Sequence, residues 1–124
     1  MMMINQWTVL NLLKQIAAID GEAPAFLLPV CLLCLEEIRG RLRDAKDEND
    51  ARVGSAAAGL AFYRLALRRI TEDGAATSFK AGDVQITGSP AELLAAAAKV
   101  RDESLAAAAP LLRDDLFFFG GVEV

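Results

Sequence analysis

Two cysteines are the residues of this chain whose spacing most suggests chemistry. Cys31 and Cys34 form a C-x-x-C pair, and a helix start near such a pair can lower a thiol pKa enough for redox reactions. The residues around them are valine and leucine, however, and no second cysteine pair follows. The sequence contains no histidine that could complete a zinc site. We therefore expect two buried, reduced thiols that pack as small hydrophobic residues.

The lack of histidine also bears on catalysis, because it removes the commonest general base and every Ser–His or Cys–His arrangement. Carboxylates are adjacent at residues 36–37 and 114–115, but neighbours on a helix point in different directions, so neither pair forms a facing dyad. The glycine-containing segment 54–59 lacks the Lys-Ser/Thr of a phosphate loop. The sequence thus predicts a protein that is not an enzyme and that has no cofactor and no metal site.

One group of basic residues has two interpretations. Arg64, Arg68 and Arg69 follow one another closely near the end of a predicted helix. They could bind an acidic partner. Cations at a helix C terminus are also favoured by the helix dipole, without any partner.

Length and composition indicate one globular domain, residues 1–124, with 54% hydrophobic and 24% charged residues. The net charge of −4 argues against a basic face for DNA or RNA, so we expect no sequence-specific nucleic-acid binding. The longest apolar run, residues 23–35, is shorter than the roughly 18 to 20 residues of a membrane span. Because the N-terminal residues lack the basic start and cleavage site of a secretory signal, we expect a cytoplasmic protein without membrane contact.

Hydrophobic periodicity predicts two helices in the first third of the chain. In residues 4–19, Asn5 can cap a helix in which a spacing of three to four residues joins Trp7, Leu10, Leu13 (or Lys14), Ala17 and Ala18. A second helix begins at Pro24 or after Pro29, since proline suits the first turn. Its apolar first half should be buried on most sides, and its second half should be amphipathic.

Two further helices are predicted beyond a charged cluster at residues 44–50. Residues 51–71 are apolar almost all round, so this third helix should be the central one. Its small residues 54–59 would let neighbouring helices approach closely. Ser89 can cap a fourth helix, and Pro110 should end or kink it.

Between the last two helices, apolar and polar residues alternate around a turn at residues 81–83. We predict a short β-hairpin or an extended loop here, which needs to pack on a helix or on another chain. Burial against the chain's own helices and contact with another chain are both compatible with the pattern. If a partner binds this segment, the candidate interface residues are Phe79, Lys80, Asp83, Val84 and Ile86.

The C-terminal residues hold three consecutive aromatic side chains, Phe117, Phe118 and Phe119. Three such neighbours in an extended segment cannot all face one core. At least one should therefore point outward or toward a partner. The predicted fold is mainly α: a bundle of about four helices, a hairpin or loop between the last two, and a short extended C-terminal tail.

Three segments of the chain resemble the small helical head-to-tail connector, or neck adaptor, proteins of tailed phages and prophages. They are Ala-Gly-Leu-Ala-Phe-Tyr-Arg-Leu-Ala-Leu at 58–67, Phe-Lys-Ala-Gly-Asp-Val-Gln-Ile at 79–86, and Leu-Leu-Arg-Asp-Asp-Leu-Phe-Phe-Phe-Gly-Gly-Val at 111–122. The resemblance implies a structural subunit, without enzymatic activity, of a ring below the portal that extends the DNA conduit toward the tail.

Such a protein would be made in the cytoplasm of the bacterial host and would end in the virion neck. Its partners would be copies of itself in the ring, the portal protein, and the next neck or tail protein. A head-to-tail ring needs two different complementary patches on each subunit, for which the hairpin and the phenylalanine tail are candidates. The alternative is a small bacterial regulatory or adaptor domain that binds one partner protein through the same aromatic tail.

Overall fold

The computed structural model describes residues 3–19, 21, 25–73, 78–81, 84–87 and 90–113, and within 69–90 it describes backbone alone. In chain order the elements are α1 (Gln6–Ala17), α2 (Leu27–Arg39), the 3₁₀ helix η1 (Ala45–Asn49), α3 (Ala51–Asp73), β1 (Ser78–Ala81), β2 (Val84–Thr87), α4 (Pro90–Ala108) and the 3₁₀ helix η2 (Ala109–Leu111). The predicted helical bundle is confirmed. None of the helices in the described ranges is long and apolar enough to cross a membrane.

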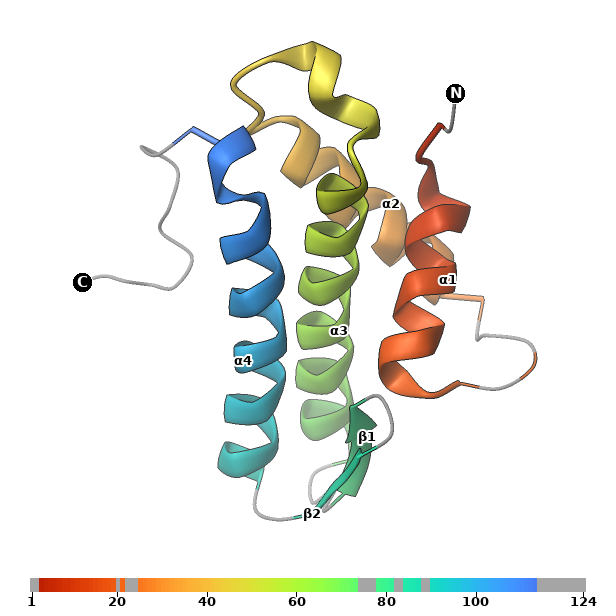
Figure 1. Ribbon diagram of the computed structural model, residues 1–124. Helices are drawn as coiled ribbons and strands as arrows, with labels where there is room; N and C mark the ends of the chain where they lie inside the picture. Colours follow the sequence, from red (N-terminus) through yellow and green to blue (C-terminus); the bar gives the residue numbers. More distant parts are fainter. Residues whose placement is uncertain are drawn as a thin grey trace.

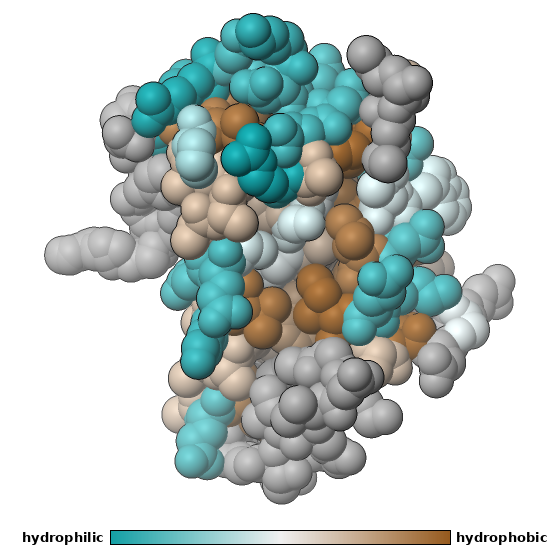
Figure 2. Space-filling model, viewed as in Figure 1, coloured by the Kyte–Doolittle hydropathy of each residue, from teal (hydrophilic) through white to brown (hydrophobic). Residues whose placement is uncertain are grey.

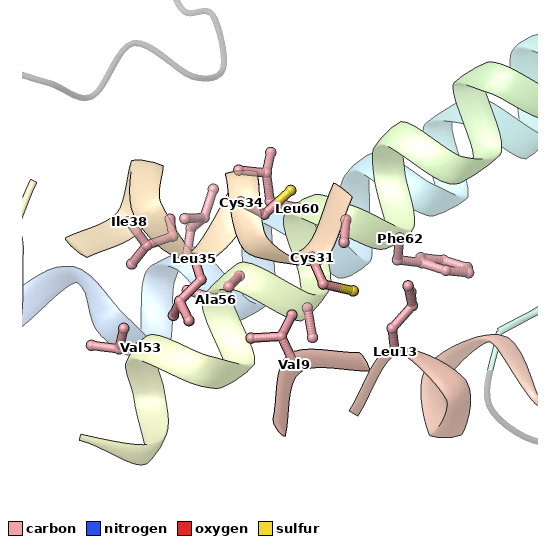
Figure 3. Packing of buried hydrophobic residues seen from close by; sticks show 14 of the residues in the cluster. Val9, Leu13, Cys31, Cys34, Leu35, Ile38, Val53, Ala56, Leu60 and Phe62 are labelled. Atoms are coloured by element: carbon pink, nitrogen blue, oxygen red, sulfur yellow. The ribbon is translucent and has the colours of Figure 1, made fainter. Parts of the chain in front are cut away.

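The long helix α3 lies at the centre of the bundle, as its all-round apolar sequence predicted. It packs against α1, α2 and α4, and Figure 1 shows α4 running beside it along most of its length. One hydrophobic cluster joins α1 and α2 to α3 and α4. Its largest fully buried side chain is Phe62 of α3. Figure 3 shows the α2 side of this cluster, with residues of α1, α2 and α3 pointing toward one another.

At one position α3 and α4 come close enough that only glycine fits. A Cβ atom added to Gly59 would lie 2.0 Å from Ser104 Oγ and 3.4 Å from Arg101 Cα. At Gly54, by contrast, an added Cβ would meet Ile4 and Leu12 side-chain atoms at 3.5 Å or more, an ordinary contact distance. The predicted close approach through the small-residue half of α3 is therefore confirmed at Gly59.

Helix α1 begins at the predicted cap but buries a different stripe of residues. Asn5 Oδ1 accepts hydrogen bonds from the amides of Trp7 (2.9 Å) and Thr8 (3.2 Å), and Thr8 Oγ1 accepts one from the Asn5 amide. The buried positions are Val9, Leu13 and Ala17, whereas Trp7 is 57% exposed. Two apolar stripes of this helix share Leu13 and Ala17, and the helix turns the Val9 stripe inward and leaves Trp7 largely in solvent.

Helix α2 begins between the two predicted starts, and it has one buried face and one exposed face. Cys31, Cys34, Leu35 and Ile38 are fully buried, as is nearly all of Leu27. On the other side Leu32 is 40% and Leu33 is 61% exposed. The prediction that the first half of α2 is buried on most sides was therefore wrong. Packing by α1 and α3 covers one side of this helix.

The loop after α2 is tied to the end of α4 by a short antiparallel bridge between Leu42 and Leu112. The amide of Arg43 donates to the Leu111 carbonyl, and the amide of Arg113 donates to the Arg41 carbonyl, both at 2.9 Å. Arg43 Nε adds a 2.7 Å hydrogen bond to the Leu112 carbonyl. The last described residues of the chain are thus fixed at the C-terminal end of α2.

Strands β1 and β2 pair antiparallel, with Phe79 opposite Ile86 and Ala81 opposite Val84. Residues 82 and 83, which connect them, lie outside the described residues. The two strands lie next to α4, and β1 also lies next to α1. The paired backbone segments therefore rest on the chain's own helices.

Candidate interaction site

The residues predicted as an interface fall largely outside what the structure describes. The backbone of Phe79, Lys80, Val84 and Ile86 lies in the paired strands, with Lys80 opposite Gln85, but their side chains are not described. Asp83 and the three aromatic residues 117–119 lie outside the described residues altogether. These positions stay predictions.

The structure shows a different feature, an open groove of about 340 Å³ between α2, α3 and α4. We call it the arginine groove. Its lining residues are Glu37, Arg41, Leu60, Tyr63, Arg64, Leu67 and Arg101. Three arginines face one glutamate, so the groove is positively charged in a protein whose net charge is −4. Leucines and a tyrosine supply apolar surface beside this charge.

An ion pair between Arg64 of α3 and Glu37 of α2 spans the groove. Arg64 Nη2 donates to Glu37 Oε1 at 2.9 Å, and Nη1 donates to Oε2, which makes the pair bidentate. The hydrogen bonds from Arg64 are the main reason that the pKa of Glu37 is lowered, and the same bonds raise the pKa of Arg64. The two side chains are 39% and 35% exposed, so the pair is accessible to a ligand from solvent.

Arg101 of α4 forms the opposite wall of the groove. Its guanidinium carbon lies 4.3 Å from the centre of the Tyr63 ring, within the range of a cation–π contact. Its Nε donates to Asp102 Oδ1 at 2.9 Å. Burial lowers the pKa of the third arginine, Arg41. Arginines held in this way match a carboxylate ligand, because guanidinium groups bind carboxylates with paired hydrogen bonds.

The arginine cluster that the sequence suggested is divided in the structure. Arg64 pairs with Glu37 inside the groove, while the guanidinium carbon of Arg68 lies 3.9 Å from the centre of the Phe26 ring. The side chain of Arg69 is not described. Of the two whose side chains the structure describes, Arg64 lines the groove and Arg68 does not.

Exposed apolar side chains lie around the groove and on α2. Leu67 lines the groove, and it adjoins Arg68, which covers Phe26 just before α2. Leu32 and Leu33 are exposed on α2; these two residues and Pro29 are here called the outer face of α2. Figure 2, viewed as in Figure 1, shows hydrophilic surface gathered at the end of the bundle near η1 and apolar surface along the helices.

Sequence reasoning missed most of this site. Nothing in the sequence marks Glu37, Arg41 and Arg101 as parts of one site. Opposite charges on α2 and α3 were the only available signal for the ion pair, and 27 positions separate its partners. Which charges meet depends on how the helices pack.

The two thiols are placed as predicted, in the core. Cys31 and Cys34 are free and fully buried, and Figure 3 shows them among residues of α1 and α3. Burial, aided by the neighbouring Cys34, raises the pKa of Cys31 to about 12. Burial likewise raises the pKa of Cys34 to about 11, although Arg64 beside it acts in the opposite direction. Thiols with such pKa values stay protonated at neutral pH and are poor nucleophiles.

In the part of the chain that the structure describes, no three His, Cys, Asp or Glu side chains are grouped so that they could hold a metal ion. No protein-family model, no curated protein and no solved structure matches this chain.

Proposed function

We propose that this protein is a structural subunit of a phage or prophage head-tail connector, which forms a ring between the portal and the tail during virion assembly. It would act without catalysis, in the cytoplasm of the bacterial host and then in the virion neck. The proposal is supported by the resemblance of segments 58–67, 79–86 and 111–122 to such proteins. In the structure the first of these segments forms part of the central helix, and the second contains the paired strands.

The observation that carries the proposal is the exposure of large apolar side chains on two different helices. Trp7 of α1 is 57% exposed and Met3, just before this helix, is 71% exposed, and Leu33 of α2 is comparably exposed. Exposed apolar groups of this kind mark interaction surfaces. A subunit that contacts a neighbour on each side needs two separate surfaces, since head-to-tail contacts are heterologous.

The test is native mass spectrometry and electron microscopy of the protein, alone and mixed with the portal protein encoded nearest to its gene. We expect a closed ring in at least one of the two samples. Trp7→Glu should abolish it, because a charge would be buried in the contact. Asn11→Glu, at an exposed polar position one turn further along α1, is the matched control and should leave the ring intact. Monomers in both samples would reject the connector proposal.

The arginine groove favours a second candidate, a small regulatory or adaptor domain that binds an acidic and apolar segment of a partner protein. The groove combines three arginines with leucine and tyrosine surface, which suits such a peptide. Gene neighbours separate the two candidates. Portal, capsid and tail genes beside this one favour the connector, and their absence favours the regulator.

A further inference from the structure

The arginine groove presents positive charge and apolar surface to solvent. Three arginines and one glutamate line it, and Tyr63 and Leu67 add apolar surface. Leu67 is 39% exposed, and the ion pair of Arg64 with Glu37 is partly exposed as well. The groove is open and has a volume of about 340 Å³, at the lower limit of ligand pockets, which hold roughly 300 to 1,000 Å³. It therefore suits a few acidic and apolar side chains of another protein surface.

A surface of that complementary kind lies where α1 begins beside η1. The amide of Ile4 donates to Asn49 Oδ1 at 2.9 Å, which holds the residues before and at the start of α1 against η1. We call this surface the N-terminal corner, and it consists of Met3, Trp7, Asp47 and Glu48. Its two apolar side chains are the most exposed part of the α1 region, at 71% and 57%.

The two carboxylates of the N-terminal corner lie in η1, where Glu48 is exposed and Asp47 is partly exposed. The cations next to them in the sequence are engaged elsewhere. Lys46 pairs with Asp44 at 3.6 Å, and Arg52 pairs with Asp50 at 3.0 Å. The N-terminal corner is thus acidic and apolar, whereas the arginine groove is basic and apolar.

The groove and the corner lie on different sides of the bundle. Arg39 of α2 donates to the Ile4 carbonyl and, through Nε at 3.4 Å, to the Glu48 carbonyl, so it points toward the corner. Glu37, two positions earlier on the same helix, lines the groove, and residues two positions apart on an α-helix point about 200° apart. Figure 1 agrees, since it shows α1 and α4 on opposite sides of α3. The two surfaces therefore meet between two copies of the chain and not within one.

We propose that the arginine groove of one copy receives the N-terminal corner of the next copy. The carboxylates of the corner then lie beside the arginines, which bind carboxylates with paired hydrogen bonds, and Trp7 lies against Tyr63 and Leu67. Because each copy has one groove and one corner in different places, the contact is heterologous and repeats from copy to copy. This inference rests on the connector proposal, in which copies contact one another head to tail, and it names the two surfaces of that contact.

Charge exchange tests the contact. The groove variant is Arg41→Glu/Arg101→Glu, which makes the groove acidic. The corner variant is Asp47→Lys/Glu48→Lys, which makes the corner basic. Either variant alone places like charges at every contact between copies, whereas a chain with all four substitutions again places opposite charges there.

The matched control is Glu92→Lys/Glu103→Lys, which changes the net charge as much as the corner variant does. Both residues are exposed on α4, and both lie about half a turn around this helix from Arg101, away from the groove. Sedimentation velocity and native mass spectrometry measure the association of each protein, alone and with the portal protein encoded nearest to its gene.

We expect the wild type and the control to associate, and the groove and corner variants to associate at least about tenfold more weakly, because like charges repel across a contact. The chain with all four substitutions should recover association. An equimolar mixture of the two variants should recover it too, since every contact between unlike copies then pairs opposite charges. Recovery also excludes unfolding as the cause of the loss.

Equal association of the wild type and the two variants would overturn this inference, and rings formed by all three would leave the connector proposal standing. Loss without recovery in the chain with four substitutions would overturn it as well. Association that follows the charge exchange but never closes into a ring would support the contact and reject the connector. Wild-type monomers in both samples would overturn both and assign the groove to an acidic segment of another protein.

Discussion

Within α2, Cys34 and Leu35 are fully buried, while Leu32 and Leu33, just before them in the chain, are exposed to solvent. The four residues are all apolar, so hydropathy does not separate them. The difference arises because α1 and α3 pack on one side of the helix, and the other side adjoins the open arginine groove, which is lined by Glu37 of α2 and by Arg41 just after the helix. The bundle thus has a closed side, built for packing, and an open side, available for binding.

The largest expected effect comes from shortening one leucine on each side of α2 and comparing the free energies of unfolding. Leu35→Ala should lower the free energy of unfolding by about 3 kcal/mol, because it leaves a cavity in the core. Leu33→Ala should lower it by less than about 1 kcal/mol, since most of this side chain is already in water. Urea denaturation followed by circular dichroism measures both. Similar losses at the two positions would contradict the division into a closed and an open side.

The sequence predicted the helices and the central place of α3 well, because these depend on local periodicity and on long apolar runs. It failed at Leu32 and Leu33, because the sequence does not show which side of that helix is buried. A helix whose sequence is apolar on several sides can turn any of them inward, and the choice depends on where the partner helices lie. Periodicity alone carries no information on that point.

Contacts between residues that lie far apart in the sequence also differ in how well the sequence predicts them. The closeness of α3 and α4 at Gly59 was predictable, because small residues on a helix let a neighbouring helix approach closely. The ion pair of Glu37 with Arg64 was not, because the chain offers many other charged residues of either sign. The predicted interface residues in 79–86 and 117–119 stay untested, as their side chains are not described.

The next largest effect tests the close contact between α3 and α4 on the closed side of the bundle. Gly59→Ala should cost about 1 to 3 kcal/mol, because the new Cβ would lie 2.0 Å from Ser104 Oγ and close to backbone atoms of α4. Gly54→Ala is the matched control in the same helix. It should be neutral or stabilise by up to about 1 kcal/mol, since alanine favours helix and the added Cβ has room.

Thermal unfolding of both glycine variants gives the comparison. Ser104→Gly, which removes the clashing atoms, should recover part of the loss when it is combined with Gly59→Ala. The close contact of α3 and α4 at Gly59 would be contradicted if Gly59→Ala were as stable as the wild type. It would also be contradicted if the double variant were no more stable than Gly59→Ala alone.

A third effect concerns the thiols of the closed side at alkaline pH. The pKa of Cys31 is raised to about 12 and that of Cys34 to about 11 in the folded protein, whereas an unfolded thiol ionises near 8.5. Their contribution to stability is complete below that unfolded value and is lost as the pH rises toward the folded values. At pH 10 we expect a loss of about 2 kcal/mol per thiol relative to pH 7, because that pH lies about 1.5 units above the unfolded pKa and each unit corresponds to about 1.4 kcal/mol.

Urea denaturation at pH 7 and pH 10 measures this loss, and Cys31→Ala/Cys34→Ala supplies the control. The double variant should be less stable at pH 7 but should lose less on going to pH 10. If both proteins respond equally to alkaline pH, the two thiols do not titrate differently in the folded and unfolded states.

The smallest effect is on the open side, at the ion pair of the groove. Glu37→Gln should cost about 0.5 kcal/mol at pH 7, because both partners are partly exposed and solvent weakens the pair. Since the pair lowers the pKa of Glu37, its stabilisation is present above the unfolded value near 4.3 and is lost as the pH falls through the folded value. The difference between wild type and variant should therefore shrink toward pH 3. Glu36→Gln, at the exposed position next to it, is the matched control for the removal of one carboxylate from α2. If the difference in the free energy of unfolding between wild type and Glu37→Gln stays constant from pH 7 to pH 3, the Glu37 side chain stabilises the groove through packing and not through its charge.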